Sequence, residues 1–177
     1  MKINTKKEKG FTLVESLIAI SILVLAVTGA FAAAQNGISS AIFSKDQIVA
    51  FYLAQEGVEI VRNRRDQNGL TGANWLSGIA NAGDPCNNGK KCKVDSLDQV
   101  NTISTCPQGQ PSCPVLKQDP VNGFFGYDSS WPDTTFKREV EITSINANEV
   151  SITVTVTWSK GLVNRSFRAR ENIFNWQ

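Results

Sequence analysis

Glu15 is the residue whose setting most suggests a chemical role. It places a carboxylate inside an apolar stretch of sequence. If such a stretch crosses a membrane, inserting an acid at the membrane centre costs roughly 2.5–3.5 kcal/mol. Thr12 lies three residues earlier, so the pair matches the Ser/Thr-x-x-Glu capping box that satisfies free amides at a helix start. The helix dipole also favours an acid in this turn. The sequence therefore predicts a helix start here and a use for the charge of Glu15.

The four cysteines form a second group of reactive side chains. Their spacings, Cys86-x5-Cys92 and Cys106-x6-Cys113, differ from the tight pairs typical of zinc sites. Outside the membrane, disulfides are the usual state of such cysteines. Three connectivities are possible, and the sequence leaves them open. We favour Cys86 with Cys92 and Cys106 with Cys113, because each pair would pin a loop that has few apolar residues.

The chain has no histidine. Nucleophiles activated by imidazole and metal sites built on histidine are therefore excluded. No glycine-rich phosphate loop and no paired catalytic carboxylates stand out. Zinc at the cysteines and calcium at Asp128 and Asp133 are less favoured, because acids in a proline-containing loop are ordinary turn residues. We predict no catalytic residue, no cofactor and no metal site, and so a protein that is not an enzyme.

The formal charge of +2 is concentrated in the first ten residues. Lysines in this leader outnumber its one acid, Glu8, which gives the leader +3 and leaves −1 for the rest of the chain. The leader lysines are Lys2, Lys6, Lys7 and Lys9. A nearly neutral body has no general attraction for DNA or RNA, so we predict no specific nucleic-acid binding. Two local basic groups are better interpreted as a solvated helix end and a solvated loop. They are Arg62, Arg64 and Arg65, and Lys90, Lys91 and Lys93.

The element that contains Glu15 is long and apolar enough to hold it at a membrane. Residues 11–34 are almost continuously apolar, and a helix of this length would be about 36 Å long. That length spans a hydrocarbon core of roughly 30 Å. Because the lysines precede it, the positive-inside rule places the leader in the cytoplasm and the remainder of the chain outside.

An ordinary secretory signal is a competing interpretation of the same segment. Ala30, Phe31 and Ala32 form an Ala-x-Ala cleavage site after an apolar run with a basic start. Cleavage there would release a secreted, disulfide-stapled binding module. Glu15 argues against this alternative, because an ordinary signal gains nothing from a carboxylate in its apolar region.

The sequence from Lys9 to Ser16, KGFTLVES, resembles the class III prepilin signal of type IV pilins and pseudopilins. The resemblance implies cleavage between Gly10 and Phe11 by prepilin peptidase, followed by N-methylation of Phe11. A residue without a side chain at position 10 lets a protease pocket approach the backbone closely. The motif covers the first third of the chain, and the rest is similar only in general layout.

The resemblance also implies a role for Glu15 in assembly. The carboxylate of one subunit would pair with the methylated amino group of Phe11 on a neighbour, and this pairing would select subunits at the correct axial height. The implied partners are other pilin subunits, the prepilin peptidase and the membrane-bound pilus or secretion machinery. Ser16, Ser21 and Thr28 are interpreted as small residues that let helices approach closely.

The helical pattern continues past the membrane segment as an amphipathic stretch to about Asp66, with Gly37 and Gly57 as weak points. Residues 67–135 are rich in Gly, Asn, Pro and Ser and predict a cysteine-containing loop region with one short helix or strand. From Phe136 the period changes to two. Residues 150–159 alternate apolar and hydroxyl side chains and predict a strand, flanked by strands at 138–145 and 162–173.

We therefore predict an α+β fold with five segments. They are a cleaved leader (1–10), a transmembrane helix (11–34), its amphipathic continuation (35–66), a loop region (67–135) and an antiparallel sheet (136–177). The helix should cover the apolar face of a three-stranded antiparallel meander. The predicted protein is a minor pilin or pseudopilin. It would be a single-pass inner-membrane protein with an extracytoplasmic domain, and would become part of a surface or periplasmic filament.

Overall fold

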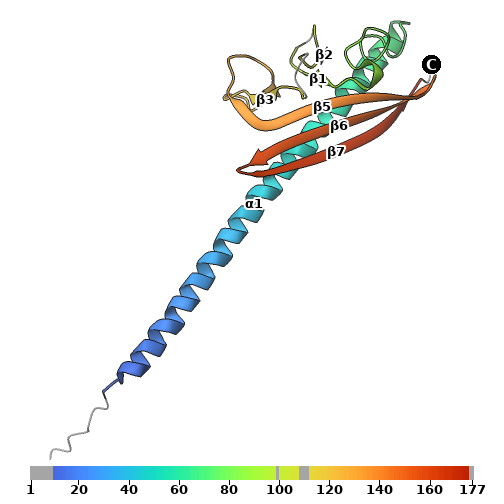
Figure 1. Cartoon of the computed structure of the whole chain (residues 1–177). Helices are drawn as coiled ribbons and strands as arrows, with labels where there is room; N and C mark the ends of the chain where they lie inside the picture. Colours follow the sequence, from blue (N-terminus) through green and yellow to red (C-terminus); the bar gives the residue numbers. More distant parts are fainter. Residues whose placement is uncertain (1–9, 99, 108–111, 176–177) are drawn as a thin grey trace, which may run out of the picture. The chain divides into compact units, whose positions relative to one another are not determined.

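The computed structural model describes residues 10–98, 100–107 and 112–175, and the chain divides into two compact units, Met1–Lys45 and Asp46–Gln177. Both units contain part of helix α1, which spans Leu13–Leu70 (Figure 1). No proline occurs before Pro85, so every residue of α1 retains its backbone donor. The leader lysines Lys2, Lys6, Lys7 and Lys9 lie outside the described residues.

In the second unit, which we call the head, α1 buries one stripe of side chains at steps of three and four residues, as the amphipathic pattern predicts. The stripe includes Ala50, Leu53, Ala54, Gly57, Val58, Val61 and Arg65. The helix ends at Leu70 and not at Asp66. Asn68, which we expected in a turn, is buried in the helix, and its amide donates to the carbonyls of Trp75 (3.1 Å) and Ser77 (2.8 Å). It anchors the following loop without ending the helix.

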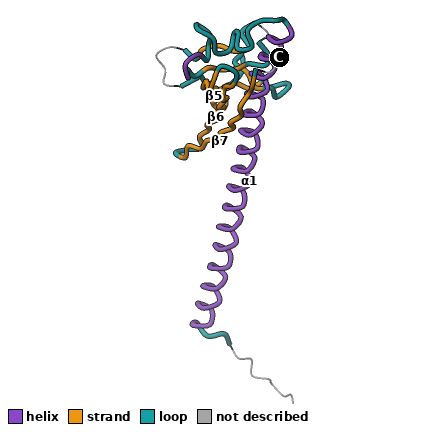
Figure 2. The backbone as a smooth tube through the Cα atoms, turned by 90° about the vertical axis from the view of Figure 1, so that its right-hand side faces the viewer, coloured by secondary structure: helices purple, strands orange, loops and turns teal. Residues whose placement is uncertain are grey.

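The described residues of the head form a seven-stranded antiparallel sheet, so the prediction of three strands is wrong in number. Its three long strands are β5 (Asp133–Asn146), β6 (Glu149–Lys160) and β7 (Val163–Phe174). They form the expected meander, in which β6 pairs with β5 on one side and β7 on the other. The C-terminal part of α1 covers one face of this meander (Figures 1 and 2). The predicted α+β class, with a helix packed on an antiparallel sheet, is confirmed.

Four short strands lie in the segment predicted as loop, residues 67–135. They are β1 (Cys92–Val94), β2 (Ile103–Thr105), β3 (Val115–Gln118) and β4 (Phe125–Gly126). A 3₁₀ turn, η1 (Asn87–Gly89), precedes β1. The free edge of β5 is divided between two of these strands, since Val140 pairs with Cys92 of β1 and Lys137 pairs with Val115 of β3. Pairing with β3 also explains why β5 begins at Asp133, before the predicted start.

Gly57 marks the closest approach of the helix to the sheet. A Cβ at this position would lie 3.0 Å from Cγ1 of Val154 on β6. Since real Cβ contacts are almost never shorter, the missing side chain lets α1 pack tightly onto β6. The position that the sequence marked as a weak point in the helix is therefore a packing contact.

Candidate functional site

The amino-terminal junction lies just before α1. Gly10 and Phe11 are both exposed. A Cβ on Gly10 would have no described atom within 4 Å. Nothing in the described part of the chain therefore requires glycine at this position.

Thr12 caps the first turn of α1. Its Oγ1 accepts a hydrogen bond from the backbone N–H of Glu15 at 3.3 Å, which is the threonine half of the predicted capping box. The Glu15 side chain is exposed, and its carboxylate has no hydrogen-bond or ion-pair partner in residues 10–98, 100–107 and 112–175. The side chain is thus available to a partner outside this molecule.

The hydroxyl groups in the same part of α1 are satisfied within the helix. Ser21 Oγ donates to the Leu17 carbonyl at 2.7 Å, and Thr28 Oγ1 donates to the Val24 carbonyl at 2.8 Å. Ser16 bonds back to Thr12 in the same way. Such bonds let hydroxyl side chains lie in an apolar medium without an unpaired donor. Glu15 is left as the one charged residue of the sequence from Phe11 to Ser44.

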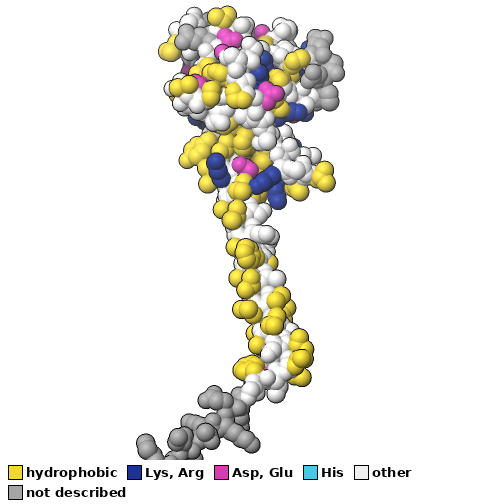
Figure 3. Space-filling view, turned by 90° about the vertical axis from the view of Figure 1, so that its left-hand side faces the viewer, with side chains coloured by type: hydrophobic (Ala, Val, Ile, Leu, Met, Phe, Trp, Pro, Cys, Tyr) yellow, Lys and Arg dark blue, Asp and Glu magenta, His cyan; other side chains and the backbone are white. Residues whose placement is uncertain are grey.

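The apolar side chains of this segment are uncovered. Ile18, Leu25 and Phe31 are 55%, 71% and 64% exposed. No residue of the most apolar 18-residue stretch of α1 is buried within the structure. Figure 3 shows hydrophobic side chains along this part of the helix. By length and composition, α1 is the one described helix that could cross a membrane. So large an apolar surface requires lipid or other helices as its surroundings.

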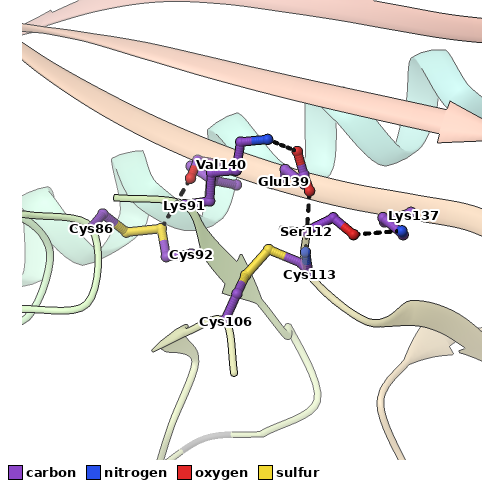
Figure 4. Close-up of a disulfide and its surroundings, with 9 residues drawn as sticks. All are labelled: Cys86, Lys91, Cys92, Cys106, Ser112, Cys113, Lys137, Glu139 and Val140. Carbon is purple, nitrogen blue, oxygen red and sulfur yellow. Dashed lines mark hydrogen bonds and ion pairs between the residues drawn. A yellow bond between two sulfur atoms is a disulfide. The ribbon is translucent and has the colours of Figure 1, made fainter. Parts of the chain in front are cut away.

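In the head, the structure bonds Cys86 to Cys92 and Cys106 to Cys113 (Figure 4). These are the two local pairs favoured above, and the prediction of disulfides in this region is confirmed. Glu139 of β5 holds both loops, because it accepts from Lys91 Nζ (2.7 Å) and from the backbone N–H of Cys113 (3.1 Å). The disulfide loops are thereby fixed to the sheet.

The arginines at the helix end have structural contacts. Arg62 pairs with Glu171 of β7 and with Glu59 (2.9 Å), and the hydrogen bond with Glu171 is the main cause that raises the pKa of Arg62. Arg65 is buried and donates to the Phe174 carbonyl at 2.9 Å. These contacts join α1 to β7.

The other polar candidates have contacts within the head. Asp133 pairs with Lys117 at 3.6 Å, whereas Asp128 accepts from the backbone N–H and the hydroxyl of Ser130. No group of three or more potential metal ligands occurs in the described residues. Trp75 is buried in the head.

Sequence reasoning missed Arg138, a fully buried charge of the described residues. Arg138 of β5 is fully buried, and its guanidinium donates to Glu56 (2.7 Å) and to the carbonyls of Leu53 (3.1 Å) and Val94 (2.7 Å). The sequence held a signal for this burial. Arg138 lies between Phe136 and Val140 in the alternating pattern of β5, so its side chain is on the inward face of the strand. A cation at such a position predicts a partner on the covering helix.

Comparison with known families gives one match. Residues 5–31 match the model of the prokaryotic N-terminal methylation motif, a segment that contains the Gly10–Phe11 junction, Glu15 and the start of the apolar helix. No curated protein and no solved structure matches the chain.

Proposed function

We propose that this type IV pilin-like chain is a structural subunit, a minor pilin or pseudopilin, of a type IV pilus or a type II secretion-like filament. The observation that carries the proposal is the first part of α1, an uncovered apolar surface with Glu15 as its one charge. Lipid could cover the apolar surface but would leave the carboxylate unpaired. A bundle of like helices covers the surface and also offers a cation.

Processing begins with cleavage between Gly10 and Phe11 by a prepilin peptidase, which then methylates the amino group of Phe11. The methylation motif supports this step. So does the setting of Gly10, because no described neighbour needs a glycine there and a close approach by an enzyme pocket does.

Assembly uses the new amino terminus. The ammonium group of Phe11 in one subunit pairs with the Glu15 carboxylate of a neighbour inside the helix bundle. Both charges are costly in a low-dielectric bundle unless they meet, so the pair selects subunits at one axial height. The capping bond from Thr12 does not compete, because it engages the backbone N–H of Glu15 and leaves its carboxylate free.

The leader is proposed to lie in the cytoplasm and the head outside the inner membrane, where its two disulfides are stable. The protein has no catalytic role in this account. Its partners are other pilin subunits, the prepilin peptidase and the assembly machinery in the membrane.

One observation favours a second candidate, a secreted binding module released by ordinary signal peptidase. Ala30, Phe31 and Ala32 form an Ala-x-Ala site, and they lie inside α1. Cleavage there would leave the head without Glu15 and without the apolar helix.

Assembly can be tested with Glu15→Leu, with Ser21→Ala as a control that alters a nearby polar side chain of α1. Tagged variants are expressed in the native cell, and their amounts are compared in membranes and in sheared filaments. We expect Glu15→Leu to reach the membrane and be lost from filaments, while Ser21→Ala assembles normally. Equal incorporation of Glu15→Leu and the unmodified chain would refute the assembly role. Gly10→Val should block processing and leave the leader attached.

A further inference from the structure

A hollow of about 560 Å³ lies in the head, between the loop after β1, the β3–β4 turn and the loop after β4. The residues that line it lie outside the segment that matches the methylation motif, residues 5–31. The volume is within the range of small-molecule sites, roughly 300–1,000 Å³. Such a hollow calls for a ligand whose chemistry matches its walls.

Aromatic and aliphatic side chains form one part of the lining. Phe124 is 58% exposed and Leu97 47% exposed, and Trp131 and Tyr127 are partly buried beside them. Gly126 of β4 lies beneath Trp131, since a Cβ there would be 3.2 Å from the indole ring and 3.4 Å from Leu97. Exposed apolar groups around a hollow are suited to an alkyl chain or another apolar ligand part.

Carboxylates form the other part. Four aspartates and one lysine line the hollow, which gives it a formal charge of −3. The aspartates are Asp95, Asp98, Asp119 and Asp128. Asp95 reaches the same glycine as the indole, because its Oδ1 would lie 3.3 Å from a Cβ on Gly126. A carboxylate therefore adjoins an aromatic ring at the floor of the hollow.

Hydrogen bonds lower the pKa of two of these aspartates, Asp98 and Asp128. Backbone N–H groups of Asn101 and Val100 lower the pKa of Asp98. Hydrogen bonds from Ser130 and the charge of Lys117 lower the pKa of Asp128, whereas the nearby charge of Asp119 opposes this effect. The negative charges of Asp119 and Asp128 thus act on each other. Lys117 already compensates part of this repulsion at Asp128, and a further cation between the loops would add to it.

The hollow already accommodates one ammonium group from the chain itself. The Nζ atom of Lys93 lies 4.6 Å from the centre of the Tyr127 ring, a cation–π contact at the wall of the hollow. Lys93 is the one basic residue among those that line the hollow, so the lining keeps a net charge of −3. A second aromatic ring, Trp131, lies near the Asp95 carboxylate and could receive another ammonium group.

We propose that this hollow binds a protonated amine carried on an alkyl chain, with the ammonium at the aspartates and the alkyl part against Trp131, Phe124 and Leu97. A free diamine and the lysine side chain of a protein both have this chemistry. The site is independent of the filament role, since it uses no residue of the first unit.

The test is calorimetric titration of the full chain in detergent with two probes, 1,5-diaminopentane and Nα-acetyl-lysine methylamide. Asp98→Asn and Asp128→Asn are the informative variants, because the amide oxygen can still accept the loop hydrogen bonds now made by Oδ1. Glu141→Gln removes one charge outside the lining and serves as the matched control. Circular dichroism checks that each variant folds.

We expect at least one probe to bind, and to bind more weakly at high salt. Each Asp→Asn change should weaken the binding of that probe about tenfold, whereas Glu141→Gln should leave its affinity nearly unchanged. Binding of the diamine alone identifies a small-molecule ligand, and binding of the lysine derivative identifies a protein side chain. The proposal is overturned if neither probe binds or if Glu141→Gln weakens binding as much as the Asp→Asn changes do. None of these outcomes bears on processing at Gly10.

Discussion

The guanidinium of Arg138 on β5 donates a 2.7 Å hydrogen bond to the carboxylate of Glu56 on α1. The other oxygen of that carboxylate accepts from Ser96 at 2.6 Å, and Arg138 also donates to the Val94 carbonyl of β1. One ion pair therefore connects the helix, the central strand and the disulfide-bearing segment. It also fixes the rotation of α1, because a turned helix would leave a buried cation without its partner.

Replacing Glu56 should destabilise the head more than replacing both partners. Breaking a buried ion pair costs about 3–5 kcal/mol, and we expect about 2–3 kcal/mol for Glu56→Leu because a third of the Glu56 side chain is exposed. The double variant Glu56→Leu/Arg138→Met should recover at least half of this loss. Urea unfolding of the full chain in detergent measures both values. A double variant at least as unstable as Glu56→Leu alone would contradict the coupling.

The close contact at Gly57 predicts different outcomes for two glycines of the same helix. Gly57→Val should lower the stability of the head by about 2–3 kcal/mol, because its side chain overlaps Val154. Gly37→Ala is the control, since a Cβ there has no described atom within 4 Å and alanine favours helix. It should leave the urea midpoint unchanged. Equal effects of the two substitutions would show that helix propensity, and not packing, decides the outcome.

Tyr127 should make the head sensitive to alkali. Burial raises the pKa of Tyr127 from 10.0 to about 12, and its hydroxyl has no well-aligned hydrogen bond in the described part of the chain. Below pH 10 the phenol is neutral in both states, so this group causes no loss of stability. Between pH 10 and 12 the unfolded chain releases the proton first, and stability falls by about 1.4 kcal/mol per pH unit. Unfolding measured from pH 8 to 12 should show a smaller decline for Tyr127→Phe. Parallel curves for the two proteins would argue against this assignment.

The two disulfides should contribute unequally. Each closes a short loop, with separations of 6 and 7 residues, for which chain entropy predicts about 2–2.5 kcal/mol. Replacing Cys86 and Cys92 by serine should cost more than replacing Cys106 and Cys113, because both members of the first pair are fully buried and Cys92 lies on β1 against β5. Urea unfolding of the two double variants gives the order. A larger loss for Cys106 and Cys113 would reverse our view of which pair holds the sheet.

Long periodic elements were predictable from the sequence. The alternation from Val150 to Ser159 identified β6, and the apolar positions at three- and four-residue steps identified the helix that covers it. The junction at Gly10 and Phe11 was recognisable because it combines a basic leader, a small residue and an acid in one short segment.

The short strands were not predictable, because elements of two to four residues show no period. β1 and β3 are strands because β5 offers a free edge, and β2 and β4 pair with them in turn, a relation that only the folded chain reveals. The hollow beside Trp131 was missed for a similar reason, since its aspartates come from three separate loops. Arg138 was overlooked although its inward position was visible, because the partner Glu56 lies 82 residues away.

The central claim is that the apolar helix and Glu15 remain on the mature protein after the leader is removed. Mass spectrometry of the intact protein and of its amino-terminal peptide, purified from native membranes, tests this directly. The account predicts a chain that begins at Phe11 with a methylated amino group. A mature chain that begins at Ala33 or later would contradict it, because such a protein lacks both the anchor and the charge on which assembly depends.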